Sequence, residues 1–212
     1  MRKGLFVIVF AWIIAACGDG NLRIEVDPNI QRNIDVGLIE DYLTERGYGE
    51  NDIDTTSTGV RYVILDRGTG PAISESDQVR YTYVGQFLSD TIFDTNIKSV
   101  ADSIRLALVE DSVGLADKSE HELYLNQFFE DRVYDNFFIT YSSSGWNFPS
   151  GTGVADGFFH GIAETFNQIN VDGEVMLLLP SALGYGTGGS GALIGPNEVL
   201  VFILSPKEVE EQ

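Results

Sequence analysis

The chain contains one cysteine, Cys17, which lies close to the N-terminus. With no second thiol, no intramolecular disulfide can stabilise the fold. Basic residues are also scarce, because 13 lysines and arginines stand against 32 aspartates and glutamates, for a formal net charge of -19. Such a surface repels the phosphates of nucleic acids and of anionic lipid headgroups, so no nucleic acid is expected as a partner.

Metal ligands and cofactor motifs are equally sparse. His121 and His160 are the only histidines and lie far apart in sequence, so neither a metal site nor a serine-type triad is expected. The carboxylates between residues 102 and 117 favour a solvated helical face over a calcium loop. Residues 184–189 fit a dinucleotide-binding glycine pattern, but no helix is predicted after them to receive a pyrophosphate. The sequence therefore predicts no cofactor.

The chain is nevertheless rich enough in apolar residues to bury a core. Of its 212 residues, 43% are hydrophobic and 11% are aromatic. These values are typical of one globular domain with extensions.

The N-terminus has the pattern of an export signal. Arg2 and Lys3 precede an apolar run over residues 5–16, which is too short to span a bilayer comfortably, and small residues come directly before Cys17. We expect residues 1–16 to be a signal peptide. The position of Cys17 resembles the lipobox of bacterial lipoproteins, which implies lipidation of Cys17 and anchoring to a bacterial cell-envelope membrane. The alternative is an ordinary signal peptide with an incidental cysteine.

A tether and a helix are expected next. Residues 17–32 are polar and without clear periodicity, as in a flexible tether. Residues 33–57 are predicted to form a helix and a linker, with Asn33 or Asp35 as the N-cap and Gly47 near the end. Apolar residues recur there at helical spacing: Ile34, Leu38, Ile39, Tyr42 and Leu43.

From residue 58 the apolar pattern changes to the alternation of β-strands. Strands are predicted near residues 60–64, 79–87, 146–148, 174–179 and 199–204, with a turn over residues 66–71. Residues 158–169 show helical spacing and would form one short central helix. Residues 95–145, with helix-like runs at 99–110 and 119–132, are interpreted as an insertion. This pattern predicts an α+β domain over residues 58–210, with an antiparallel β-sheet wrapped around the central helix.

Four motifs occur in order within this domain. They are Tyr83-Val84-Gly85 with Phe93-Asp94, the segment 148–158, the segment 180–186 and Leu193-Ile194-Gly195-Pro196. In these motifs the chain resembles FKBP-type peptidyl-prolyl cis-trans isomerases. The resemblance covers residues 58–209 apart from the insertion, and it implies an FKBP-like fold.

The resemblance also implies a proline-binding pocket. Tyr185, Asp94 and Phe158 would be its catalytic residues, with Phe158 as the floor. The backbone amide of Ala155 and the hydroxyl of Tyr185 would hold the carbonyl groups of the substrate. The other substrate-binding residues would be Tyr83, Phe93, Trp146, Val154, Leu193, Ile194 and Phe202.

The chain departs from the family pattern at several positions. Phe158 replaces the usual tryptophan, Ala155 replaces a larger aliphatic residue, and Ser89-Asp90 stands where aspartate-glycine is common. These changes put the depth of the pocket in doubt. We therefore expect any binding of macrolide immunosuppressants to be weakened.

The sequence thus predicts an exported isomerase that rotates X-Pro bonds in unfolded or partly folded polypeptides and assists their folding. The alternative is a non-catalytic chaperone or peptide-binding module on the same fold. A structural envelope lipoprotein unrelated to isomerases would require the motifs to be accidental. The insertion has two possible roles: it could bind unfolded polypeptides, or it could form a small core of its own. We favour a core of its own. Either role would involve its apolar residues, which are Leu123, Tyr124, Phe128, Phe129, Phe137 and Phe138.

Overall fold

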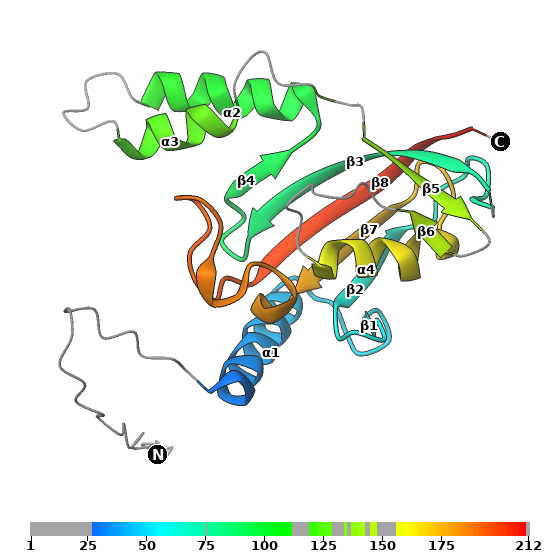
Figure 1. The fold of residues 1–212 in the computed structure, drawn as a ribbon, viewed down its shortest axis with the longest axis horizontal. Helices are drawn as coiled ribbons and strands as arrows, with labels where there is room; N and C mark the ends of the chain where they lie inside the picture. Colours follow the sequence, from blue (N-terminus) through cyan, green and yellow to red (C-terminus); the bar gives the residue numbers. More distant parts are fainter. Residues whose placement is uncertain are drawn as a thin grey trace.

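A computed structural model describes residues 27–74, 76–111, 119–128, 134, 137–142, 145–147 and 156–210 (Figure 1). One 8-stranded sheet dominates these residues. Its strands are β1 (Asp54–Thr55), β2 (Arg61–Asp66), β3 (Gln78–Phe87), β4 (Ile92–Thr95), β5 (Phe137–Ser142), β6 (Gly145–Asn147), β7 (Glu174–Leu179) and β8 (Leu200–Glu210).

The strand order is β1-β2-β7-β8-β3-β5-β6, and β4 pairs with β3 outside this path. All pairs between these strands are antiparallel. Among the described residues, the short helix α4 (Asp156–Thr165) covers one face of the sheet (Figure 1). The predicted α+β architecture, an antiparallel sheet around one short helix, is therefore confirmed.

Both faces of the central strands are buried, which explains their unbroken apolar sequence. Because successive side chains of a strand point to opposite faces, Leu177 and Leu179 of β7 join the core beneath α4. Met176 and Leu178 join a second apolar cluster beneath the helix α1 (Pro28–Glu45). The sheet is thus the middle layer between α4 and α1.

The helix α1 begins earlier than the sequence patterns predicted. Asp27 caps it by accepting a hydrogen bond from the amide of Asn29 at 2.8 Å, and Pro28 occupies the first turn. Proline is favoured there because its missing N–H would have no helical partner and its φ is already helical. The predicted cap at Asn33 or Asp35 is therefore wrong, and residues 28–32 belong to α1 and not to the tether.

The described part of the insertion contains the helices α2 (Lys98–Asp111) and α3 (Ser119–Gln127) and part of the main sheet. These helices follow β4 and pack against each other (Figure 1). The helix predicted over residues 119–132 ends at Gln127 in the described chain. Residues 137–142 form β5 and pair with β3, so this part of the predicted insertion is an integral strand. No described helix is both long and apolar enough to cross a membrane.

The central helix is shorter than its apolar pattern predicted. It ends at Thr165, whose hydroxyl donates to the carbonyl of Gly161 at 2.7 Å, and the chain continues as the 3₁₀ helix η1 (Phe166–Gln168). Phe166 and Ile169 are still buried in the core. Apolar spacing alone does not distinguish the last turn of an α-helix from a following 3₁₀ turn.

Candidate functional site

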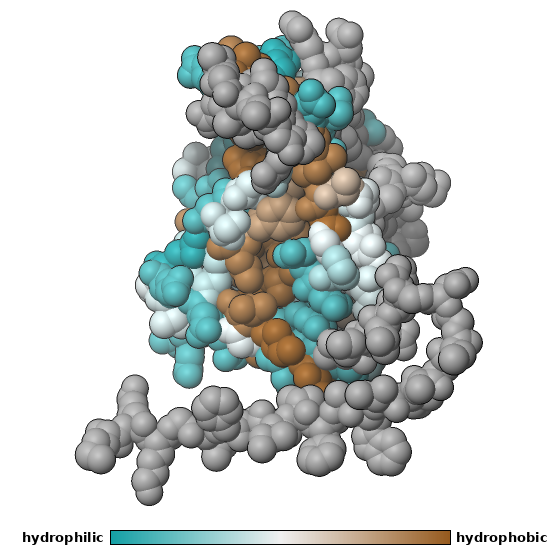
Figure 2. Space-filling model, turned by 90° about the vertical axis from the view of Figure 1, so that its left-hand side faces the viewer, coloured by the Kyte–Doolittle hydropathy of each residue, from teal (hydrophilic) through white to brown (hydrophobic). Residues whose placement is uncertain are grey.

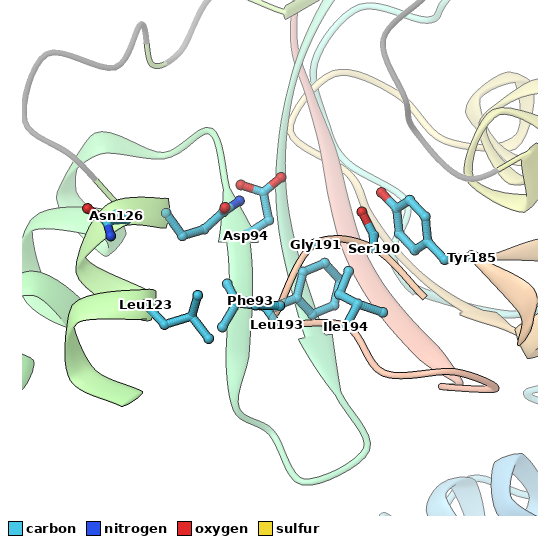
Figure 3. Close-up of a pocket in the computed structure, with 11 residues that line it drawn as sticks. Phe93, Asp94, Leu123, Asn126, Tyr185, Ser190, Gly191, Leu193 and Ile194 are labelled. Carbon is cyan, nitrogen blue, oxygen red and sulfur yellow. The ribbon is translucent and has the colours of Figure 1, made fainter. Parts of the chain in front are cut away.

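A cavity of about 250 Å³ opens between β4, the loop after β7 and the helix α3. Its described lining residues are Phe93, Asp94, Leu123, Asn126, Gln127, Tyr185, Ser190, Gly191, Ala192, Leu193 and Ile194. Figure 3 shows Leu123 and Asn126 on one side of the cavity and Tyr185 on the other. Among the predicted site residues, the fold thus gathers Phe93, Asp94, Tyr185, Leu193 and Ile194.

Asp94 is fixed in the wall by hydrogen bonds to its carboxylate. The hydroxyl of Tyr83 donates to Oδ2 at 2.7 Å, and the amide of Thr95 donates to Oδ1 at 2.9 Å. Buried Asn96 clamps β4 to β3, because its Oδ1 accepts from the amide of Tyr83 at 2.7 Å and its Nδ2 donates to the carbonyl of Tyr81 at 2.9 Å. Asp94 therefore has a defined orientation at the cavity.

Tyr185 is presented by a tight segment that follows β7. The segment contains the 3₁₀ turns η2 (Ser181–Leu183) and η3 (Gly186–Gly188), and Tyr185 lies between them. Gly186 has a φ of 56°, in the left-handed region that favours glycine. Its carbonyl accepts a hydrogen bond from the amide of Asn197 at 2.8 Å. This contact closes the base of the loop that carries Leu193 and Ile194.

The environment of Tyr185 keeps its hydroxyl protonated. Partial burial raises the pKa of Tyr185 above its ordinary value, and the negative charge of Asp94 raises this pKa further. A neutral tyrosine at the cavity can donate one hydrogen bond. The site therefore combines a hydroxyl donor, a carboxylate acceptor and apolar walls.

An aromatic cluster lies behind Phe93. The rings of Phe93 and Phe202 have centroids 5.6 Å apart, and those of Phe202 and Phe158 are 4.8 Å apart. Phe158 also packs edge-on against Tyr83 at 5.7 Å. Only 2% of the surface of Phe158 is exposed, and Phe158 is absent from the described lining of the cavity. Phe158, Tyr83 and Phe202 thus support the wall from the core, and the role of Phe158 as a floor stays a prediction.

Other predicted site residues lie outside what the structure describes. Val154, Ala155 and Cys17 are outside the described residues, so their predicted roles stay predictions. Trp146 lies in β6, and only its backbone position is described.

The helix α3 contributes residues to the cavity that the family motifs did not identify. Leu123, Asn126 and Gln127 all line it. Leu123 was predicted to belong to a separate small core, whereas Phe128 at the end of the helix is fully buried. The sequence did indicate that the insertion lies near the cavity, because the insertion starts directly after Phe93-Asp94 and must leave the sheet beside these two residues.

The helix α1 contacts the segments that carry both polar groups of the site. Asp35 is fully buried, and its Oδ2 accepts from the amide of Ser181 at 2.9 Å and from its hydroxyl at 2.7 Å. Ser181 begins the segment that leads to Tyr185. The Nη2 of Arg46 donates to both carboxylate oxygens of Asp90, at 2.5 and 2.6 Å, in the turn between β3 and β4. The helix therefore connects the two walls of the cavity.

Comparisons with known proteins point to one family, although no protein-family model matches the chain. The chain is 22% identical over 158 residues to a Haemophilus influenzae protein named "Probable FKBP-type peptidyl-prolyl cis-trans isomerase", covering 74% of this chain and 46% of that protein. It is 23% identical over 168 residues to the FKBP-type 22 kDa peptidyl-prolyl cis-trans isomerase of Escherichia coli K12, and this alignment covers 79% of this chain and 58% of that protein. The chain thus spans about half the length of the curated relatives it matches.

Solved structures were compared as well. A peptidyl-prolyl cis-trans isomerase from Pseudomonas syringae aligns with a TM-score of 0.47 and 16% identity, over 88% of this chain and 98% of that one. The predicted family resemblance is confirmed by the two sequence relatives, and this chain is similar to FKBP-type peptidyl-prolyl cis-trans isomerases over most of its length.

Proposed function

We propose that the chain is a peptidyl-prolyl cis-trans isomerase that acts on X-Pro bonds in unfolded or partly folded polypeptides. The observation that carries this proposal is the cavity in which Tyr185 and Asp94 flank the apolar side chains of Phe93, Leu193 and Ile194. The sequence similarity to FKBP-type isomerases supports the same activity.

Rotation about an X-Pro bond requires neither a nucleophile nor a metal. The barrier of about 18–20 kcal/mol arises because resonance gives the C–N bond partial double-bond character. An apolar cavity that holds the proline ring removes water from the imide and favours the twisted state, in which charge separation is smaller. Phe93 and Ile194 supply apolar walls, and the neutral hydroxyl of Tyr185 can orient a carbonyl group beside the bond.

The test is a protease-coupled assay with a short proline-containing peptide, using the full-length protein. We expect Tyr185→Phe to lower kcat/KM by about two- to thirteenfold, the factor that corresponds to one hydrogen bond of about 0.5–1.5 kcal/mol. Tyr48→Phe is the matched control, because Tyr48 is part-buried near the end of α1 and does not line the described site cavity.

Equal losses in the two variants would contradict a specific role for Tyr185. A wild-type protein that binds the peptide without accelerating its isomerisation would contradict catalysis and favour a peptide-binding module. Circular dichroism of each variant checks that the fold is retained.

We further propose that the protein is exported and anchored to a bacterial cell-envelope membrane by a lipid on Cys17. The basis is the sequence alone: a basic start, the apolar run 5–16 and small residues before the cysteine. Metabolic labelling with a fatty acid should mark the wild-type protein and not Cys17→Ser. Labelling of both proteins equally would contradict the anchor.

We propose that macrolide immunosuppressants, if they enter this cavity, bind weakly. The departure from the family pattern at Ala155, where a larger aliphatic residue is usual, supports this expectation, because alanine offers less apolar surface to a ligand. Calorimetric titration with a macrolide should give a weak signal in the wild-type protein. Tight binding of the macrolide to the wild-type protein would contradict this proposal.

A further inference from the structure

An apolar band extends well beyond the candidate proline cavity. Figure 2 shows it running down one face of the molecule, between more polar flanks. One end of the band is the helix α1, where Ile30, Ile34 and Leu38 are exposed by 52%, 47% and 44%. These residues are spaced four apart and therefore share one face of the helix, over about 12 Å at 1.5 Å per residue.

A second hollow joins this stripe to the candidate site. It is a shallow groove of about 350 Å³, and its described lining includes Leu38, Phe87, Leu88, Leu193 and Val199. Leu193 also lines the candidate proline cavity. The stripe on α1, the groove and the cavity therefore follow one another on the surface. Leu38 belongs to both the stripe and the groove, and Leu193 belongs to both the groove and the cavity.

The charged residues in the described linings of the two hollows are all acidic. Glu198 is the only charged residue in the described lining of the groove, and Asp94 is the only one in that of the cavity. No lysine or arginine belongs to the described lining of either hollow. A ligand that matches this path is apolar and carries positive charge.

We infer that the groove and the exposed stripe of α1 bind an extended polypeptide segment next to its X-Pro bond, and that this segment carries apolar side chains and lysine or arginine. The inference rests on the proposed isomerase function, because the cavity defines where the proline lies. Continuity with that cavity favours an extended substrate. A second copy of this chain is disfavoured, because two proteins with a formal net charge of -19 repel each other.

The experiment compares peptides that share one short X-Pro core. One peptide has only the core, and two others carry an eight-residue arm of leucine, valine and lysine before or after it. Eight extended residues span up to about 26–29 Å, more than the length of the α1 stripe. Fluorescence anisotropy gives the affinity of each peptide for the full-length protein, and the protease-coupled assay gives kcat/KM.

We expect one of the arms to tighten binding by about tenfold, because a few apolar side chains leave water. Leu38→Gln should abolish most of this gain and leave kcat/KM for the short core unchanged. Ile34→Gln is a second variant with the same expected effect. Leu106→Gln is the matched control, because Leu106 of α2 is 62% exposed and belongs to the described lining of neither hollow.

Several results would overturn the inference. Equal affinities for core and armed peptides would exclude the groove as a binding surface, and so would a gain that survives both α1 substitutions. Self-association lost in Leu38→Gln would assign the stripe to a second copy. Because anisotropy measures binding without turnover, a protein that binds the armed peptides but does not isomerise them would contradict the proposed activity and leave the groove supported.

Discussion

Tyr185 titrates in an environment that disfavours its phenolate. Partial burial and the carboxylate of Asp94 both raise its pKa above the ordinary value of 10.0. Below this value the tyrosine is protonated in both the folded and the unfolded protein, so its titration does not affect stability there. Above it the unfolded chain releases the proton while the folded protein keeps it, and folding therefore becomes less favourable.

We predict that the stability of the wild-type protein falls as the pH rises through 10.0 and that this fall is smaller in Tyr185→Phe. Other buried tyrosines, such as Tyr81, whose pKa is also raised by burial, contribute to the fall in both proteins. Urea denaturation at a series of pH values provides the measurement. An equal fall in the variant would mean that the environment of Tyr185 does not raise its pKa.

The sequence predicted which residues belong to the site better than it predicted how deeply each side chain is buried. Phe93, Asp94, Tyr185, Leu193 and Ile194 were identified from motifs, and all line the cavity. The family resemblance also implied Phe158 as the floor of the pocket, but a matching motif does not show how deeply a side chain lies. Whether it reaches the cavity depends on the packing of Phe202 and Tyr83 around it. For the same reason Phe158→Ala would be a poor test of catalysis, since emptying so buried a position costs about 3–5 kcal/mol of stability.

At the scale of elements, α4 lies very close to the sheet. A Cβ atom built on Gly161 would overlap the side chain of Leu177, which is fully buried. We predict that Gly161→Ala destabilises the protein by about 1–3 kcal/mol through overpacking. Gly37 of α1 is the matched control, because nothing lies within 4 Å of its added Cβ. Gly37→Ala should instead stabilise the protein by up to about 1 kcal/mol.

The comparison is made by urea denaturation of the two variants and the wild type. If Gly161→Ala were neutral, α4 would be able to move away from β7, and the close packing would not be a constraint on the fold.

The contact between α1 and the loop of Tyr185 depends on one buried carboxylate. Asp35→Ala would leave the amide and hydroxyl of Ser181 without their acceptor, which costs about 1–3 kcal/mol. Asn at this position keeps an oxygen that can accept from Ser181, and its amide nitrogen can donate to Gln31, which now donates to Asp35 at 2.7 Å. We therefore predict that Asp35→Asn loses less stability than Asp35→Ala.

The same variants test whether α1 positions the site. Asp35→Ala should lower kcat/KM for a short proline peptide, because Ser181 begins the segment that holds Tyr185, and Asp35→Asn should retain more of this activity. Thermal denaturation and the isomerase assay give the two readouts. Equal losses in both variants would show that the acceptor oxygen is not what matters.

Regular elements were predictable where local sequence determines them. The alternation of Val79, Tyr81 and Tyr83 predicted β3, and the apolar run 174–179 predicted β7. The start of α1 was missed although Asp27 and Pro28 are favourable helix-starting residues. The strand β5 was missed because its partner, β3, lies far away in sequence, so its pairing is a tertiary feature.

At the scale of the whole molecule, the charge of -19 opposes compaction through self-repulsion. The ion pairs of the described residues, such as that of Arg46 with Asp90, are partly exposed and each contribute little. We predict that the melting temperature rises as the ionic strength increases from about 0.01 to 0.15 M, over which the Debye length falls from about 30 to 8 Å. Differential scanning calorimetry at a series of salt concentrations measures this melting temperature. A lower melting temperature in salt would mean that attractive pairs outweigh the repulsion.

The central place of β8 in the sheet determines when the candidate cavity can form during folding. Without β8 the sheet separates into one part made of β1, β2 and β7 and another that contains β3, β4, β5 and β6. Tyr185 follows the first part, and Asp94 lies in the second. Because β8 is the last of the described strands in the chain, the two walls of the cavity are joined only once β8 has paired with both parts.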